Sequence, residues 1–194
     1  MIVKVCGITN IEDARAAVDA GANAMGFNFY PKSPRYISFD TAQAIIATLP
    51  ASILKVGVYV NEAPAGQAAQ LQLDVLQVHG ELTQYPTARL WKAVSVKTGF
   101  DAGMLDDPQA EAFLLDAPAP EQYGGTGKTF DWELVRGLNR RIIVAGGLDA
   151  SNVAQAIAVA KPWGVDACSR IESAPGKKDP QKMAAFIEAA LKAI

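Results

Sequence analysis

The stretch Val3-Lys4-Val5-Cys6-Gly7-Ile8-Thr9-Asn10 decides the fold of this chain. The apolar run from Ile2 to Cys6 contains a single lysine and predicts a strand, which the following glycine ends. Thr9 and Asn10 then offer N-caps to a helix. Cys6 therefore stands at the carboxyl end of a first strand, the edge where ligands bind in parallel α/β folds.

The alternation of strand and helix continues along the rest of the chain. Apolar runs predict eight strands: Ile2–Cys6, Ala24–Phe29, Ile53–Val60, Asp74–Val78, Leu90–Val96, Ala112–Leu115, Arg141–Ala145 and Trp163–Ala167. Helical segments separate them, and those after strands four and five are short or weak. We predict an α/β protein with a single (β/α)8 TIM-barrel domain over residues 1–194, compact, with shortened helices after strands 4 and 5. A doubly wound open sheet is the alternative, although it normally has fewer strands and one dominant glycine-rich turn.

Composition and charge restrict the possible partners. The chain of 194 residues has a formal net charge of −2, which gives no electrostatic argument for binding nucleic acid or an acidic membrane. Its two cysteines do not make a disulfide framework, so a reducing, cytoplasmic compartment is expected. The N-terminus enters a strand at once, which leaves no room for a signal peptide, and no apolar run reaches transmembrane length. A small-molecule ligand is expected, for a monomer or a homodimer.

A closed barrel would bring the residues that follow its strands to one face. Cys6 and Asp116 are then a thiol and a carboxylic acid on rigid strand ends, a pair suited to proton transfer. Asp116 directly follows the apolar run Phe113-Leu114-Leu115, and partial desolvation would raise its pKa. Each residue also has a plainer interpretation, Cys6 as a buried packing residue and Asp116 as a cap or loop carboxylate.

Two further groups at the same face suit anions. Gly146-Gly147 and Ser169-Arg170 follow strands seven and eight, whose loops frequently form a phosphate site in this fold. Arg35 lies in a loop made stiff by two prolines, where its guanidinium can bind a planar carboxylate bidentately. A plain tight turn and a solvated arginine are the alternative interpretations.

Strand alternation puts Lys4 on the same face as Cys6, roughly 7 Å below it. A buried lysine needs a partner, and Asp166 on the adjacent eighth strand is the candidate. A cation there would favour a thiolate at Cys6. His79 is the only histidine, its role is open, and no Cys/His spacing resembles a metal site.

The order of these motifs resembles that of the phosphoribosylanthranilate isomerases, the barrel enzymes of tryptophan biosynthesis. The resemblance covers the whole chain. It is carried by Lys4-Val5-Cys6-Gly7-Ile8-Thr9, Gly26-Phe27, Ser33-Pro34-Arg35-Tyr36-Ile37, Leu76-Gln77-Val78-His79-Gly80, Asp116 with Gly124-Gly125-Thr126-Gly127, and Ala145-Gly146-Gly147-Leu148. Near the eighth strand the chain departs from the family, with Cys168 in place of a serine and Arg170 in place of a frequent glycine.

The resemblance implies an aldose–ketose isomerase that carries out an Amadori rearrangement. N-(5-phosphoribosyl)anthranilate would become 1-(2-carboxyphenylamino)-1-deoxyribulose 5-phosphate, with Asp116 as general acid and Cys6 as general base. Arg35 would bind the substrate carboxylate, and Gly146, Gly147, Ser169 and Arg170 would bind the phosphate. No metal and no organic cofactor is implied, because an acid, a base and positioning suffice.

Other functions stay open at this level. Indole-glycerol-phosphate synthase would need catalytic lysines at strand ends, which are not evident. The histidine-pathway isomerase typically has an aspartate where Cys6 stands. A ligand-binding barrel without catalysis, or a redox sensor that uses Cys6 and Cys168, belongs to a different class.

Overall fold

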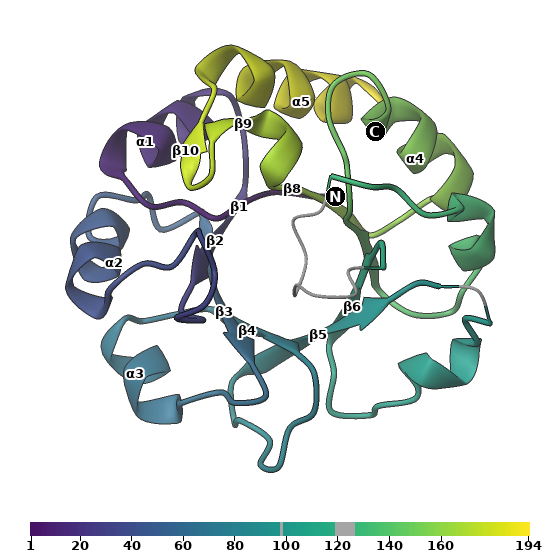
Figure 1. Cartoon of the computed structure of the whole chain (residues 1–194), viewed down its shortest axis with the longest axis horizontal. Helices are drawn as coiled ribbons and strands as arrows, with labels where there is room; N and C mark the ends of the chain where they lie inside the picture. The colour runs from purple at the N-terminus through teal and green to yellow at the C-terminus, as the bar shows by residue number, and fades with distance from the viewer. Residues whose placement is uncertain (98, 119–126) are drawn as a thin grey trace.

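The eight predicted strands form a closed parallel barrel in a computed structural model of the chain (Figure 1). The structure describes residues 1–97, 99–118 and 127–194. The barrel strands are β1 Ile2–Cys6, β2 Ala24–Asn28, β3 Leu54–Val60, β4 Val75–His79, β5 Arg89–Ser95, β6 Ala112–Asp116, β7 Ile142–Val144 and β8 Gly164–Ala167. Each strand pairs with its sequence neighbour, and β8 pairs with β1. The predicted barrel is confirmed and the open sheet is excluded.

Helices form an outer ring around the barrel. The α-helices are α1 Ile11–Asp19, α2 Phe39–Ile46, α3 Ala65–Gln70, α4 Val153–Ala160 and α5 Pro180–Lys192, and the 3₁₀-helices are η1 Ala102–Leu105, η2 Trp132–Val135 and η3 Ser169–Ile171. No helix forms in the described segment 80–88 between β4 and β5, and η1 alone follows β5. The predicted shortening is therefore confirmed. The helix expected between β6 and β7 is also short, since only the 3₁₀-helix η2 forms there among the described residues.

Side-chain alternation divides the interior into two layers. Val3 and Val5 of β1 point outward into the large apolar layer between barrel and helices. Lys4 and Cys6 point inward. The smaller apolar cluster inside the barrel lies below them and consists of Ala24, Val56, Val75, Trp91, Ala112, Leu114, Ile143 and Ala145. It leaves the upper part of the barrel to polar side chains.

Helix α5 packs between α1 and α4 on the ring (Figure 1). Asp179 caps it and Pro180 begins it, the start that the dipeptide Asp179-Pro180 predicts from the sequence. It buries Met183, Phe186 and Ile187 completely, and each such side chain stabilises the fold by roughly 1.5–3 kcal/mol. Among the described residues, no helix has both the length and the apolar character that crossing a membrane requires.

Local capping follows one of the two residues offered for α1 and differs from the prediction for α2. Asn10 rather than Thr9 caps α1, because the Asn10 side chain accepts from the Asp13 N–H at 2.8 Å. Thr9 instead donates to the Gly176 carbonyl. Asp40 precedes the helically spaced apolar residues Ala42, Ile45 and Ile46, which predicts Asp40 as the cap of α2. That prediction is wrong, because Ser38 is the cap. Asp40 lies inside the first turn, where its charge still favours the helix N-terminus.

The sequence patterns also miss a β-hairpin after β8. Strands β9 Glu172–Ala174 and β10 Lys177–Lys178 pair antiparallel and turn at Gly176, whose φ is 80°. The hairpin lies beside β1 and α1 at the rim of the barrel (Figure 1). It places Glu172 and Lys178 next to the carboxyl ends of β1 and β8.

Candidate active site

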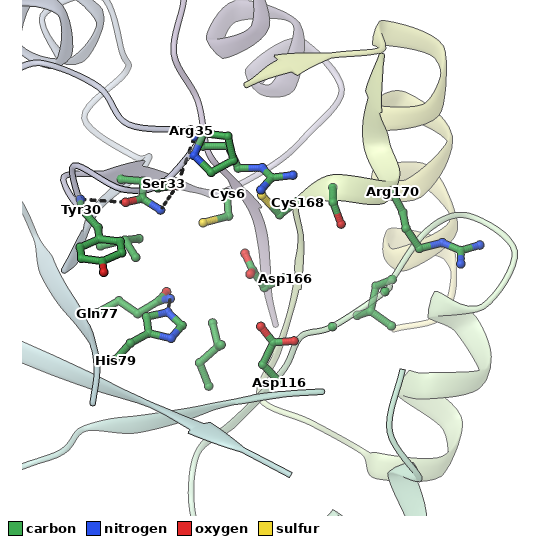
Figure 2. Close-up of a pocket in the computed structure, with 18 of the residues that line it drawn as sticks. Cys6, Tyr30, Ser33, Arg35, Gln77, His79, Asp116, Asp166, Cys168 and Arg170 are labelled. Carbon is green, nitrogen blue, oxygen red and sulfur yellow. Dashed lines mark hydrogen bonds between the residues drawn. The ribbon is translucent and has the colours of Figure 1, made fainter. Parts of the chain in front are cut away.

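A pocket opens at the carboxyl ends of the strands (Figure 2). The predicted residues that line it are Cys6, Arg35, Asp116, Gly146, Gly147, Ser169 and Arg170. Asn28, Tyr30, Gln77, His79, Asp166 and Cys168 line it as well. The structure therefore brings every predicted site residue to one pocket. Of the matched glycine-rich motif, Gly124, Gly125 and Thr126 lie outside the described residues.

Cys6 ends β1 and is almost buried, with 8% of the residue exposed. Its paired residue on β2 is Gly26, where a Cβ atom would lie only 2.7 Å from Cys6 Sγ. The glycine therefore leaves the space that the thiol occupies. A hydrogen bond with Cys168 and the charge of Lys4 lower the pKa of Cys6 well below its ordinary value, although burial opposes them. The environment of Cys6 therefore favours its thiolate form.

Lys4 forms the predicted ion pair with Asp166, which lines the bottom of the pocket. Lys4 Nζ lies 2.8 Å from Asp166 Oδ1, and Lys4 is fully buried. The register pairs Lys4 with Asp166 directly across β1 and β8, which is why closure of the barrel creates this contact. Burial opposes the charge on Lys4, but the Asp166 and Cys6 charges outweigh it and raise the pKa of Lys4. The prediction is confirmed, and a fixed cation lies beneath Cys6.

Asp116 ends β6 and points into the same pocket (Figure 2). Burial raises its pKa to about 6, against the hydrogen bond that the Ala117 N–H donates to Oδ1 at 2.7 Å. Gly146 adjoins it closely, since a Cβ at that position would lie 2.6 Å from Asp116 Oδ1. Asp116 is therefore a carboxylic acid that can hold and release a proton near neutral pH.

Arg35 reaches the pocket already paired, which the sequence did not predict. Glu172 accepts from Arg35 Nε at 3.0 Å and from Nη2 at 2.8 Å, and both side chains are nearly buried. Glu172 binds Nε and Nη2 of Arg35 and does not bind the third nitrogen, Nη1. The ion pair fixes the plane of the guanidinium before any ligand binds.

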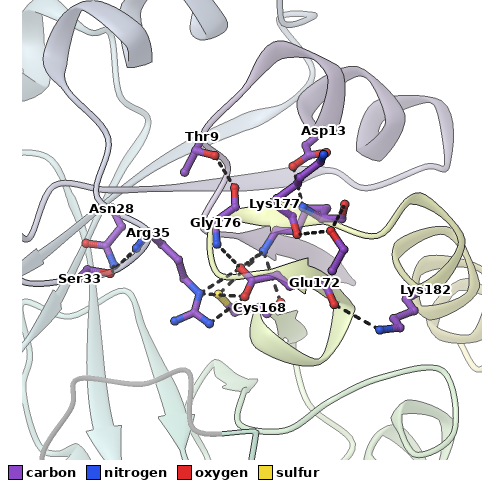
Figure 3. A network of polar contacts seen from close by, with 12 residues as sticks. Thr9, Asp13, Asn28, Ser33, Arg35, Cys168, Glu172, Gly176, Lys177 and Lys182 are labelled. Atoms are coloured by element: carbon purple, nitrogen blue, oxygen red, sulfur yellow. Dashed lines mark hydrogen bonds and ion pairs between the residues drawn. The ribbon is translucent and has the colours of Figure 1, made fainter.

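Glu172 is the centre of a polar network that ties the hairpin to the pocket (Figure 3). Its Oε1 also accepts from Lys178 Nζ at 3.0 Å and from the Gly176 N–H at 3.3 Å. Burial opposes its ionisation, but the Arg35 hydrogen bond and the Lys178 charge outweigh this effect and lower the pKa of Glu172. A carboxylate between two cations is thus kept ionised, and it holds Arg35 in place.

The predicted anion site is a pair of left-handed glycines after β7. Gly146 and Gly147 have φ values of 80° and 60°, and a Cβ at Gly147 would lie 2.7 Å from the Gly127 carbonyl oxygen. Asn152 supports the turn by donating to the Gly147 carbonyl at 2.8 Å. The turn thus requires glycines and leaves its backbone open to the pocket.

Ser169 and Arg170 face these glycines from the first turn of η3. The Arg170 guanidinium is turned away from Cys6 and Asp116 (Figure 2) and pairs with Asp149, whose Oδ2 lies 2.6 Å from Nε. The ion pair therefore directs the Arg170 side chain toward Asp149, away from the thiol and the carboxylic acid.

His79 ends β4 opposite Cys168, with its Nε2 atom 3.1 Å from Gln77 Nε2. Burial and the Lys4 charge lower its pKa to about 4, so the imidazole is neutral near pH 7. Within the described residues, the buried Gln77 Oε1 atom accepts no hydrogen bond, and no group of three or more metal-ligating side chains occurs. This wall of the pocket is polar and uncharged.

A closed eight-stranded parallel barrel with a ring of helices and a pocket at the carboxyl ends of its strands places the chain in the class of (β/α)8-barrel proteins. Residues 3–189 match the family model of N-(5'-phosphoribosyl)anthranilate (PRA) isomerase. The chain belongs to the PRA isomerase family. It is an isomerase of tryptophan biosynthesis.

Individual relatives agree with this assignment over the full length. The N-(5'-phosphoribosyl)anthranilate isomerase of Solibacter usitatus is 56% identical over 200 residues, which cover 100% of this chain and 99% of that protein. The crystal structure of the Thermotoga maritima enzyme has a TM-score of 0.86 at 41% identity and covers 99% of this chain and 100% of its own. A solved complex with reduced 1-(o-carboxyphenylamino)-1-deoxyribulose 5-phosphate has a TM-score of 0.83 at 37% identity, over 99% of this chain and 100% of its own.

Proposed function

We propose that this chain converts N-(5'-phosphoribosyl)anthranilate into 1-(2-carboxyphenylamino)-1-deoxyribulose 5-phosphate by an Amadori rearrangement. The observation that carries the proposal is the opposed tuning of two groups in one pocket. The pKa of Cys6 is lowered and that of Asp116 is raised to about 6, so a base and an acid coexist near neutral pH.

Asp116 supplies the first proton in this mechanism. Its carboxylic acid protonates the ribose ring oxygen, the C1–O bond breaks, and the nitrogen lone pair forms a Schiff base. The Cys6 thiolate then removes the proton from C2, and the electron pair flows to the nitrogen to give an enolamine. Tautomerisation of the enolamine to the ketone completes the reaction. Lys4 stabilises the thiolate from below throughout.

Binding is assigned to the two ends of the substrate. Arg35, held by Glu172, binds the anthranilate carboxylate through the part of its guanidinium that Glu172 leaves open. Backbone N–H groups of Gly146, Gly147, Ser169 and Arg170 bind the phosphate. The substrate would then lie across the mouth between Cys6 and Asp116.

The reaction itself is tested by adding the protein to freshly prepared phosphoribosylanthranilate. Loss of the substrate's fluorescence at a rate proportional to protein concentration is expected. A tight complex without turnover would instead indicate a ligand-binding barrel. Gel filtration of the same preparation distinguishes a monomer from a homodimer, both of which the proposal allows.

We expect Arg35→Lys to raise KM at least tenfold and to change kcat much less. Lysine keeps the charge but loses the fork that Glu172 orients, and each lost charge-assisted hydrogen bond costs roughly 1.5–3 kcal/mol. Arg35 takes part in neither of the proton transfers assigned to Asp116 and Cys6, so its substitution should change KM rather than kcat. Steady-state kinetics measure both constants.

The matched control for Arg35 is Arg136→Lys. Arg136 pairs with Glu133 on the exposed η2 helix, away from the pocket, so its substitution should leave KM unchanged. An Arg35→Lys enzyme with wild-type KM would remove Arg35 from the binding site.

We expect a crystal soaked in phosphate to hold the anion over Gly146-Gly147 and against the N–H groups of Ser169 and Arg170. Arg170→Ala should change KM less than about fivefold, because an exposed ion pair such as that with Asp149 contributes at most about 1 kcal/mol. Kinetics of this variant and the soaked structure check the two statements. An anion bound only by the loop at 124–127 would contradict the assignment.

A further inference from the structure

The two cysteines of the chain lie side by side at the mouth of the barrel. The β1–β8 register pairs Lys4 with Asp166 and Val5 with Ala167. Cys6 and Cys168 are the residues that follow, Cys6 at the end of β1 and Cys168 directly after the end of β8. Residues paired across neighbouring strands are about 4.8 Å apart, so two residues one step beyond the last printed pair start near the Cα separation that a disulfide requires. Both are free thiols, and they share a hydrogen bond.

The backbone around the pair leaves room for the sulfurs to meet. Gly7 follows Cys6, and a Cβ at Gly7 would lie 3.2 Å from Cys168 Sγ. Any larger residue at position 7 would crowd Cys168. Both cysteines stand where a strand ends and the chain turns, with Cys168 as the N-cap of η3. Small adjustments of these turns are less costly than movement inside a paired strand.

Three cations surround the pair. Lys4 lies beneath Cys6, and Lys178 Nζ is 3.9 Å from Cys168 Sγ. The Arg35 charge also acts on Cys168. Cations favour thiolates, and the thiolate is the form that reacts with peroxides. Cys6 lines the open pocket and Cys168 is only half-buried, so a small oxidant can reach them.

We propose that Cys6 and Cys168 form a hydroperoxide-reactive dithiol that closes to a disulfide and removes the thiolate of the active site. In the first step the Cys6 thiolate attacks one oxygen of hydrogen peroxide, the O–O bond breaks, and hydroxide leaves. Cys6 becomes a sulfenic acid, and the peroxide is reduced. In the second step the Cys168 thiolate attacks Cys6 Sγ, a disulfide forms, and hydroxide departs to be protonated to water.

The order of the two steps follows from the charges. In the resting pair, the hydrogen bond with Cys6 and burial raise the pKa of Cys168, so Cys168 stays a thiol. Oxidation of Cys6 to a neutral sulfenic acid removes that negative neighbour. The charges of Lys178 and Arg35 lower the pKa of Cys168, and after this oxidation the negative charge on Cys6 no longer opposes them. Cys6 is thus the reacting cysteine and Cys168 the resolving one.

The test treats the whole protein with stepwise hydrogen peroxide, blocks free thiols by alkylation, and reads mass and activity together. In the wild type we expect the loss of two hydrogens, a link between tryptic peptides 5–15 and 142–170, and at least a tenfold loss of activity that a dithiol reductant reverses. Each variant is compared with its own untreated rate.

Cys168→Ser separates a disulfide from simple oxidation. It should form no link, gain oxygen on Cys6, and lose activity that the reductant does not recover, because sulfinic acid is irreversible under these conditions. Wild-type protein that carries oxygen on Cys6 without the link, or only links between chains, would overturn the proposal. A link that forms without loss of isomerase activity would support the dithiol and instead refute Cys6 as the base.

Discussion

Cys6→Ser should lower kcat about 10² to 10⁴-fold and leave KM within a few-fold of the wild-type value, as expected for a lost general base. A serine hydroxyl fills nearly the same space beside Gly26, but it does not ionise near neutral pH. Lys4 can stabilise a thiolate at this position and cannot generate an alkoxide. Substrate contacts through Arg35 and the glycine turn are unaffected.

The measurement is steady-state kinetics across a range of substrate concentrations, with circular dichroism as a check on folding. Cys168→Ser is the matched control. Serine can still donate a hydrogen bond to Cys6, and one hydrogen bond contributes roughly 0.5–1.5 kcal/mol, so the loss in kcat should stay within about tenfold. If Cys168→Ser proves to be the inactive enzyme and Cys6→Ser the active one, the choice of base is wrong.

The part of the site that rests on strand geometry was predictable from the sequence. Lys4 and Cys6 share a face because side chains alternate, and Lys4 meets Asp166 because a barrel must pair its first strand with its last. Asp116 could be recognised as a desolvated acid from the apolar run before it. These inferences need only the period of a strand and the closure of the sheet.

The contacts that position Arg35 were not predictable in the same way. Glu172 lies 137 residues away in sequence and reaches Arg35 from a hairpin. Strands β9 and β10 are only three and two residues long, too short for a detectable alternation. The dipeptide Pro175-Gly176 was the local signal for a turn, and it does not show that short strands flank it. A pairing of this kind depends on where two rim loops meet, which local patterns do not encode.

Helix assignments failed where more than one local arrangement is acceptable. Ser38 rather than Asp40 caps α2, since the turn before it brings the Ser38 hydroxyl within 3.2 Å of the Thr41 N–H. The segment after Asp131 closes only a 3₁₀ turn, although its apolar residues have helical spacing. Both choices are among locally acceptable alternatives, so the neighbouring elements decide between them.

The glycines show how sequence and site connect. Gly26 makes room for the Cys6 thiol and Gly146 for the Asp116 carboxylate, each with less than 3 Å to a hypothetical Cβ. The sequence marked Gly146 as part of an anion turn. It carried no sign that the same residue also allows the acid to pack against β7, because that contact joins two strand ends.

Asp116→Asn should lower kcat about 10² to 10⁴-fold, because the carboxamide keeps the shape of the side chain but cannot donate a proton to the ring oxygen. The asparagine Oδ1 can still accept from the Ala117 N–H, so the local structure should persist. Asp101→Asn is the matched control. Asp101 caps η1 through its own Oδ1, outside the pocket, and its substitution should leave kcat unchanged.

The pH profile adds a test that a merely structural role for Asp116 would not pass. As an acid, Asp116 must be protonated, and its pKa is raised to about 6, so wild-type kcat/KM should fall as pH rises through about 6. Cys6 must be ionised, so the rate should also fall on the acidic side, as pH drops below the lowered pKa of the thiol. In Asp116→Asn the alkaline decline near pH 6 should vanish while the acidic decline remains. An Asp116→Asn enzyme that retains both limbs, or near-normal turnover, would show that another group supplies the proton.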